Sequence, residues 1–153
     1  GHRAALNAIS HPFPDAQRQR CVPHKMENVL SYIPQSQQEV VKPQLKAIFY
    51  HDSLEQAQQE LLAFCAKHER IYPNAVACLK RDQDACLAFY RFPKEHWKTI
   101  RTNNLIERLF AEVKKRSHKM AAPFRNENSC LLLFYAVTRT LRFQQISMPR
   151  SRP

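Results

Sequence analysis

One glutamate and one lysine in the last third of the chain have a spacing that suits phosphoryl-transfer chemistry. Glu107 and Lys114 are seven residues apart, which places them two helical turns apart on nearly the same helix face. The same stretch is rich in bases: Arg108, Lys115, Arg116 and Lys119. A carboxylate can hold a hard cation, and the bases around it can hold phosphates. The pattern is typical of a metal-dependent site that acts on a polyanion.

A purely structural interpretation of the same residues is also open. Asn104 and Glu107 have the spacing of a capping box, in which the glutamate only satisfies backbone N–H groups at a helix start. Glu112 lies four residues from both Arg108 and Arg116, so these side chains can form ordinary surface ion pairs. Spacing alone favours this structural interpretation, because single motifs of this kind are weak signals.

The element that must position these residues is a helix. Its apolar residues recur at helical spacing and predict one buried stripe, formed by Leu105, Ile106, Leu109, Phe110 and Val113. Thr102, Asn103 and Asn104 precede the stripe, where a helix start favours capping side chains. A last helix over 129–144 is apolar on nearly every side, which predicts a buried core helix.

Composition limits the class of protein. The 153 residues carry 24 Lys and Arg against 13 Asp and Glu, and this net charge of +11 indicates a polyanionic partner. Solvated surface lysines are the alternative explanation. The lone glycine, Gly1, excludes Gly-rich phosphate loops and disfavours a turn-rich β fold. We expect neither a membrane span nor a signal peptide, because no apolar run is long enough.

The cysteines predict free thiols in a reducing compartment, because five is an odd number and no C-x-x-C pair occurs. Cys21 and His24 have C-x-x-H spacing, which is half of a zinc site. A structural zinc needs about four ligands, and no second half is evident. A small packed cysteine beside a partly buried histidine is therefore the favoured interpretation.

Apolar periodicity and the prolines place the remaining elements. Helices are expected over 1–10, 26–33, 36–49, 54–70, 75–79 and 82–89. Pro43 should kink or split its helix, because proline lacks a backbone N–H. Ser53 is expected to cap the helix that follows it. A short strand is expected at 20–22.

Four segments, taken together, resemble the transposases of bacterial insertion sequences in the Mutator superfamily, which are DDE-type enzymes with a ribonuclease-H-like core. The segments are residues 1–9, RQRCVPHKMENV at 18–29, DQDACLAFYRF at 82–92 and IRTNNLIERLFAEVKKRS at 100–117. They follow the family's order across nearly the whole chain, and the last is the most specific. The chain departs from the family at Asn103 and Ser117, where threonine is common, and after Met120, where a glycine and a proline are absent.

The resemblance implies roles for the residues singled out above. Glu107 looks like the third acid of the DDE triad and a ligand of Mg²⁺, and Lys114 looks like the family's basic residue seven positions on. Cys21 and His24 look like the family's C-x-x-H signature, with a structural or DNA-linked role and no zinc. The bases expected along the DNA path are Arg101, Arg108, Lys115, Arg116 and Lys119. With the resemblance added, the catalytic interpretation of Glu107 outweighs the capping one.

The resemblance also implies a fold. We expect a mainly α chain that forms the C-terminal fragment of a ribonuclease-H-like α/β transposase core, with a helical insertion and at most one or two short strands. The expected divisions are a core remnant over 1–30, the helical insertion over 31–93, closing helices with the third acid over 94–146 and a disordered tail over 147–153.

Two of the family's three acids have no counterpart here. None of Asp15, Asp52, Asp82 and Asp84 matches their positions, and the second acid would directly precede a glycine that resembles Gly1. One carboxylate cannot position two cations, so we expect a transposase fragment that is inactive alone. A DNA-binding or interaction remnant without catalysis is the alternative. The expected partners are element ends, target DNA and a second copy of the chain, in the bacterial cytoplasm and away from membranes.

Overall fold

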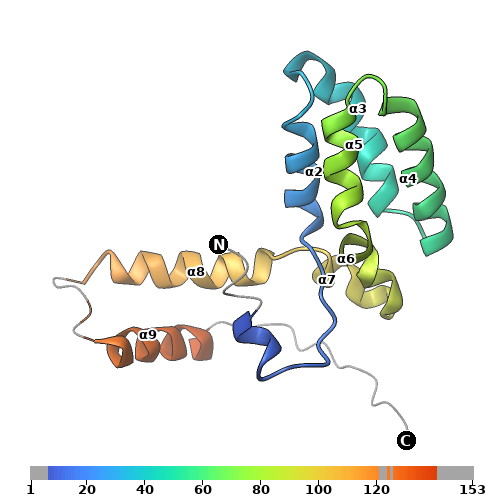
Figure 1. Cartoon of the computed structure of the whole chain (residues 1–153). Helices are drawn as coiled ribbons and strands as arrows, with labels where there is room; N and C mark the ends of the chain where they lie inside the picture. The colour runs from blue at the N-terminus through green and yellow to red at the C-terminus, as the bar shows by residue number, and fades with distance from the viewer. Residues whose placement is uncertain (1–6, 121–123, 125, 141–153) are drawn as a thin grey trace, which may run out of the picture. The chain divides into compact units, whose positions relative to one another are not determined.

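The computed structural model describes residues 7–120, 124 and 126–140, and the chain divides into two compact units. The first unit runs to Thr102 and the second begins at Asn103. The regular elements in the described residues are helices, and no strand occurs among them (Figure 1). The expected mainly α fold is therefore confirmed.

Four helices that lie side by side form the body of the first unit (Figure 1): α2 (Val22–Leu30), α3 (Gln35–Phe49), α4 (Leu54–His68) and α5 (Pro73–Arg81). α2 packs against α3 and α5, and α3 packs against α4. Shorter pieces follow: α6 (Gln83–Leu87), the 3₁₀ helices η1 (Ala88–Arg91) and η2 (Lys94–His96), and α7 (Trp97–Ile100). Residues 7–10 form a further helical turn.

The core of the first unit is continuous from α2 to η1. Its fully buried side chains include Val29, Leu45, Phe49, Leu79 and Phe89. Each large apolar side chain that leaves water contributes roughly 1.5–3 kcal/mol to folding. Burial of these apolar faces, more than helix propensity, therefore holds the short helices in place.

Most predicted helices of the first unit are present, with shifted ends. Ser53 caps α4 as expected, because its Oγ accepts a hydrogen bond from the backbone N–H of Gln56 at 3.2 Å. α2 begins at Val22 and not at residue 26, since Pro23 suits the first turn of a helix. Two apolar side chains, Val40 on α3 and Leu62 on α4, lie outside the core and are more than 60% exposed.

The predicted split of α3 at Pro43 is wrong, whereas a kink there stays a prediction. The helix continues from Gln35 to Phe49 through the proline. Pro43 removes the N–H that would bond the carbonyl of Glu39, and both residues are exposed, so water can satisfy that carbonyl. Val41 and Leu45 are buried on either side of the proline and anchor both halves of the helix in the core.

The strand predicted just before α2 is also wrong. The N–H of Arg20 donates to the carbonyl of Ala85 at 2.8 Å, so its partner is a helix and not a strand. The side-chain amide of Gln19 donates to the carbonyl of Cys86 at 3.0 Å and accepts from the N–H of Phe89 at 2.8 Å. Helical hydrogen bonding is interrupted where α6 ends and η1 begins, which leaves backbone groups without partners in a helix. The irregular segment at residues 19–20 forms hydrogen bonds with these groups.

The second unit pairs α8 (Asn104–Ser117) with α9 (Glu127–Thr140). The rings of Phe110 and Phe134 meet edge to face, with centroids 5.7 Å apart. Within the described part of this unit, only Val113 and Val137 are buried. Residues 141–144 of the predicted last helix and the tail expected at 147–153 lie outside the described residues.

The buried stripe predicted for α8 and the buried core helix predicted for α9 are therefore wrong for most of their residues. Large apolar side chains about half exposed or more include Leu105, Ile106, Phe110, Leu131, Leu132 and Tyr135. Periodicity identifies the apolar face of a helix but not what covers it. Two paired helices shield only the seam between them, so the flanks of both apolar faces stay open within this unit.

Candidate functional site

The residue at which α8 begins determines the position of Glu107 in the helix. Asn103 occupies the N-cap position, and its carbonyl accepts a hydrogen bond from the N–H of Glu107 at 3.0 Å. Glu107 is thus the fourth residue of the helix, whereas a capping box would need Asn104 at the N-cap and Glu107 at the third position. The capping-box register is not adopted.

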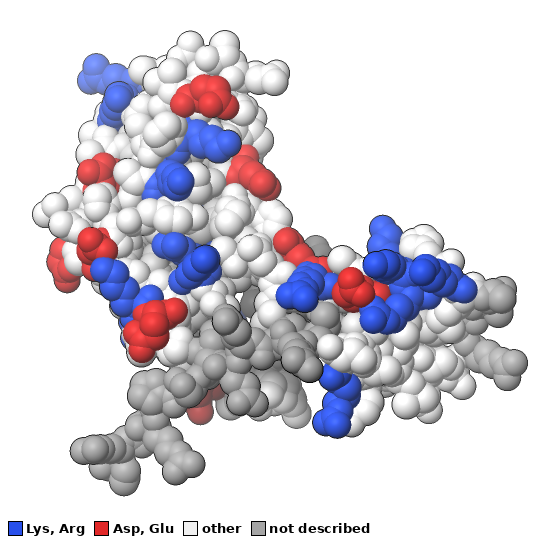
Figure 2. Space-filling model, turned by 180° about the vertical axis from the view of Figure 1, so that it is seen from behind, with Lys and Arg blue, Asp and Glu red and all other residues white. Residues whose placement is uncertain are grey.

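Charged side chains on α8 collect on the face that carries Glu107. Lys114 lies two turns beyond Glu107 on nearly the same line, and Arg108 and Lys115 form a parallel line about 100° around the helix. All four side chains are exposed. Figure 2 shows more basic than acidic side chains over this helix. We call Glu107, Arg108, Lys114 and Lys115 the α8 charged ring.

Arg116 differs from the α8 charged ring in both position and partner. It is nine residues from Glu107 and so lies about 180° around the helix from it. Its guanidinium forms an ion pair with Glu112 at 2.5 Å, and this hydrogen bond lowers the pKa of the Glu112 carboxyl. Lys119 lies beyond the last residue of α8, in a turn where its N–H bonds to the carbonyl of Arg116. The predicted DNA contacts of Arg116 and Lys119 stay predictions.

Arg101, at the end of the first unit, packs against aromatic rings. Its guanidinium lies 4.0 Å from the ring centroid of Tyr50 and 5.9 Å from that of Phe89. It also donates a hydrogen bond to the carbonyl of Phe49 at 3.2 Å. These contacts give Arg101 a structural role in the first unit, whereas its predicted contact with DNA stays a prediction.

Cys21 and His24 lie in the first turn of α2. Cys21 is the N-cap residue and is half-buried, while His24 is exposed. The next backbone N–H, that of Val22, donates to the carbonyl of Arg101 at 2.8 Å. A backbone hydrogen bond therefore joins the C-x-x-H segment to Arg101, which precedes α8 in the chain. No group of three side chains able to hold a metal ion occurs in the described part of the chain.

The aspartates of the first unit include two that form ion pairs. Asp82 pairs with Arg20 at 3.2 Å and with Lys25 at 3.3 Å, and the Lys25 side chain is nearly completely buried. Asp52 pairs with Lys94 at 2.5 Å, and the hydrogen bond from this lysine lowers the pKa of the carboxyl. Lys25 is a core ion-pair residue that the sequence alone did not reveal; its helical spacing with Val22 and Val29 was the available signal.

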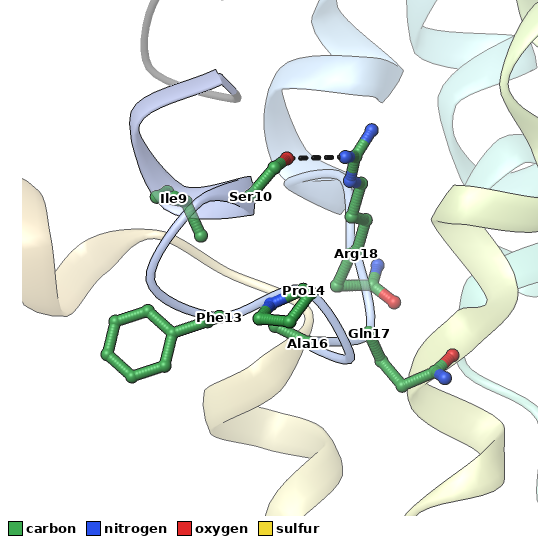
Figure 3. Close-up of a pocket in the computed structure, with 8 residues that line it drawn as sticks. Ile9, Ser10, Phe13, Pro14, Ala16, Gln17 and Arg18 are labelled. Carbon is green, nitrogen blue, oxygen red and sulfur yellow. Dashed lines mark hydrogen bonds between the residues drawn. The ribbon is translucent and has the colours of Figure 1, made fainter.

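A shallow hollow of about 200 Å³ lies at the N-terminal segment of the first unit. Figure 3 shows Ile9, Phe13 and Pro14 on one side of it and Arg18 on the other. Arg18 donates a hydrogen bond to the hydroxyl of Ser10 at 2.7 Å. None of the predicted site residues lines this hollow.

Comparison with known proteins identifies the class to which the chain belongs. The family model described as "Transposase, Mutator family" matches residues 1–146. The chain is therefore a member of the Mutator family of transposases, which confirms the resemblance of its motifs.

Individual relatives are transposases of bacterial insertion sequences. The chain is 40% identical over 110 residues to the transposase for insertion sequence element IST2 of Acidithiobacillus ferrooxidans, an overlap of 72% of this chain and 37% of the relative. It is 38% identical over 116 residues to the IS6120 transposase of Mycolicibacterium smegmatis, covering 76% and 36%. It is 31% identical over 145 residues to the IS905 transposase of Lactococcus lactis, covering 95% and 37%. The matched part is little more than a third of each relative.

The helices of the described residues do not include one long and apolar enough to cross a membrane.

Proposed function

We propose that this chain is part of an insertion-sequence transposase that cleaves and joins DNA by metal-dependent phosphoryl transfer, and that α8 presents Glu107 to the DNA. The observation that supports this most directly is the exposed carboxylate of Glu107 among the bases of the α8 charged ring. Membership of the chain in the Mutator family of transposases supports DNA as the polymer on which the chain acts.

The acidic and the basic side chains of α8 would have different roles. Glu107 would supply one carboxylate oxygen to Mg²⁺, a hard cation that binds oxygen ligands. When bound, the ion stabilises negative charge that develops on the phosphate. Because the described residues contain no complete metal site, the other ligands would come from elsewhere in the complete enzyme. Arg108, Lys114 and Lys115 would bind the neighbouring phosphates and fix the register of the DNA along α8.

The charge distribution supports DNA binding independently of catalysis. Residues 103–153 hold ten of the 24 Lys and Arg but only three of the 13 Asp and Glu. An excess of positive charge concentrated in one part of a chain is typical of contact with a polyanion. This observation equally favours the second candidate function, DNA binding without chemistry.

DNA binding is tested with the chain itself. Its affinity for duplex DNA of arbitrary sequence, measured by fluorescence anisotropy, should fall steeply as salt increases, because each phosphate contact releases counterions. Arg108→Ala or Lys115→Ala should each reduce the slope of log affinity against log salt by about one. The proposal is rejected if the chain does not bind DNA at low salt, or if its affinity does not change with salt concentration.

Catalysis is tested in the complete transposase that contains this segment. Glu107→Gln keeps the size of the side chain but removes the charge that holds the cation, so strand cleavage should be lost while DNA binding persists. Glu112→Gln is the matched control on the same helix, about 140° away, and it should retain activity. Activity in both variants would leave DNA binding without catalysis as the function of α8, and the reverse result would assign the acid to Glu112.

A further inference from the structure

Ala111 stands at the centre of the α8 charged ring. On a helix surface, the neighbours of a residue are those three and four positions away. For Ala111 these neighbours are Glu107, Arg108, Lys114 and Lys115. Ala111 itself is exposed, and its methyl group is much shorter than the carboxylate side chain and the three cationic side chains around it.

We propose that Ala111 is a positioning residue, the point at which a DNA phosphate comes closest to α8. The inference rests on the proposed function, in which this face of α8 meets DNA. The chemistry is that of a phosphodiester oxygen, which accepts charge-assisted hydrogen bonds from Arg and Lys nitrogens at about 2.7–2.9 Å. Only a small central side chain lets one phosphate approach several of the surrounding cations together.

The balance of charge in the ring also fits this role. The three cations outweigh the carboxylate of Glu107, and the neighbouring Glu112, which Arg108 and Lys115 also attract, is paired with Arg116. A phosphate above Ala111 therefore meets net attraction. The approach would also bring that phosphate near the carboxylate proposed to bind the cation. A larger side chain at position 111 would hold the phosphate away from both the bases and Glu107.

Other exposed alanines of the described residues lack such a setting. Ala63 on α4 has Gln59, Glu60, Ala66 and Lys67 as its neighbours three and four positions away. Ala136 on α9 has Leu132, Leu133, Arg139 and Thr140. Neither is enclosed by three cations, and Ala63 therefore offers a matched control for a change in size alone.

The test compares Ala111→Leu with Ala63→Leu in the whole chain, using a fluorescent duplex of arbitrary sequence. Leucine forms helices nearly as well as alanine, so neither substitution should change the helical circular dichroism signal. Ala111→Leu should weaken binding about tenfold at low salt and flatten the salt dependence, as expected when one or two phosphate contacts are lost. Ala63→Leu should leave the DNA affinity unchanged, and Ala111→Ser, which keeps a small side chain, should bind like the unmodified chain.

Three further variants, Arg108→Ala, Lys115→Ala and Ala111→Met, separate this inference from the proposed function. If Arg108→Ala and Lys115→Ala weaken binding but Ala111→Leu and Ala111→Met do not, the ring binds DNA and the positioning role of Ala111 is rejected. If none of the four weakens binding, both the inference and the proposed role of α8 are rejected. Equal losses in Ala111→Leu and Ala111→Ser would also overturn the inference, because size would not then be the cause.

Discussion

The guanidinium of Arg101 lies 4.0 Å from the ring centroid of Tyr50, within the first unit and only six residues before Glu107. A guanidinium stacked on an aromatic face gains both electrostatic and packing energy, and a lysine cannot reproduce the planar contact. The hydrogen bond to the carbonyl of Phe49 adds to this. An arginine that sequence analysis assigns to DNA contact thus has a defined task in holding α3 and the end of α7 together.

We expect Arg101→Lys to lower the free energy of unfolding by about 1–2 kcal/mol, since it loses the stacked contact and the geometry of the hydrogen bond. Urea denaturation measures the change, with Arg81→Lys at the end of α5 as the control. If Arg101 acts mainly by charge toward DNA, the lysine variant will instead unfold like the unmodified chain and keep its DNA affinity.

Removing the proline inside α3 should stabilise the chain. Pro43→Ala restores a backbone N–H opposite the carbonyl of Glu39 and relieves an interior helical proline, a gain of about 1–3 kcal/mol. Pro73→Ala is the opposite control, because proline in the first turn of α5 is favourable there. A lower midpoint of urea denaturation for Pro43→Ala would show that the packing of α3 requires the proline.

Alkaline pH should destabilise the first unit through Cys86. Burial raises the pKa of this thiol from 9.0 to about 11. The folded chain therefore holds the proton over a range in which the unfolded chain loses it, so stability falls as the pH rises above about 9. This difference in pKa corresponds to roughly 2–3 kcal/mol of unfolding free energy lost by about pH 11. Cys86→Ala should flatten the curve of unfolding free energy against pH in this range, and an unchanged slope would contradict the assignment.

Acid should destabilise the same unit through His68, which packs between the rings of Phe64 and Tyr72. Burial, with a smaller effect from Lys67, lowers the pKa of the imidazole below its usual 6.5. The unfolded chain then binds a proton that the folded chain resists, so stability is full above about pH 6.5 and declines below it. His68→Gln should remove part of this decline in melting temperatures measured from pH 7 down to pH 5. A steeper decline of the melting temperature with falling pH in the variant would contradict this assignment, because protonation of His68 would then stabilise the fold.

Local chemistry explains the parts of the fold that could be predicted from sequence. The hydroxyl of Ser53 is a signal that acts within one helix, and the cap that it predicts for α4 is confirmed. The fate of Pro43 depends instead on which side of α3 faces water, and the packing of Val41 and Leu45 decides that. The open apolar flanks of α8 likewise depend on what lies against them, which periodicity does not contain.

The candidate site also has features that follow from local sequence and features that depend on distant contacts. The line from Glu107 to Lys114 follows from helical spacing alone, and so does the place of Ala111 among its four charged neighbours. The partners of Arg101 could not be predicted, because Phe49 and Tyr50 lie about fifty residues earlier in the chain. The pairing of Arg116 with Glu112 was open to prediction as one of two alternatives at four-residue spacing.

The amide of Gln19 has a consequence for the order of events during synthesis. Its partners Cys86 and Phe89 lie 67 and 70 residues further along the chain. Such distant contacts form only after a long loop has closed, which favours late formation. On the ribosome, the segment around Gln19 must wait until η1 has been made and has left the exit tunnel. The helices from α2 to α5 can assemble during that delay, so the N-terminal segment should dock onto a bundle that has already formed.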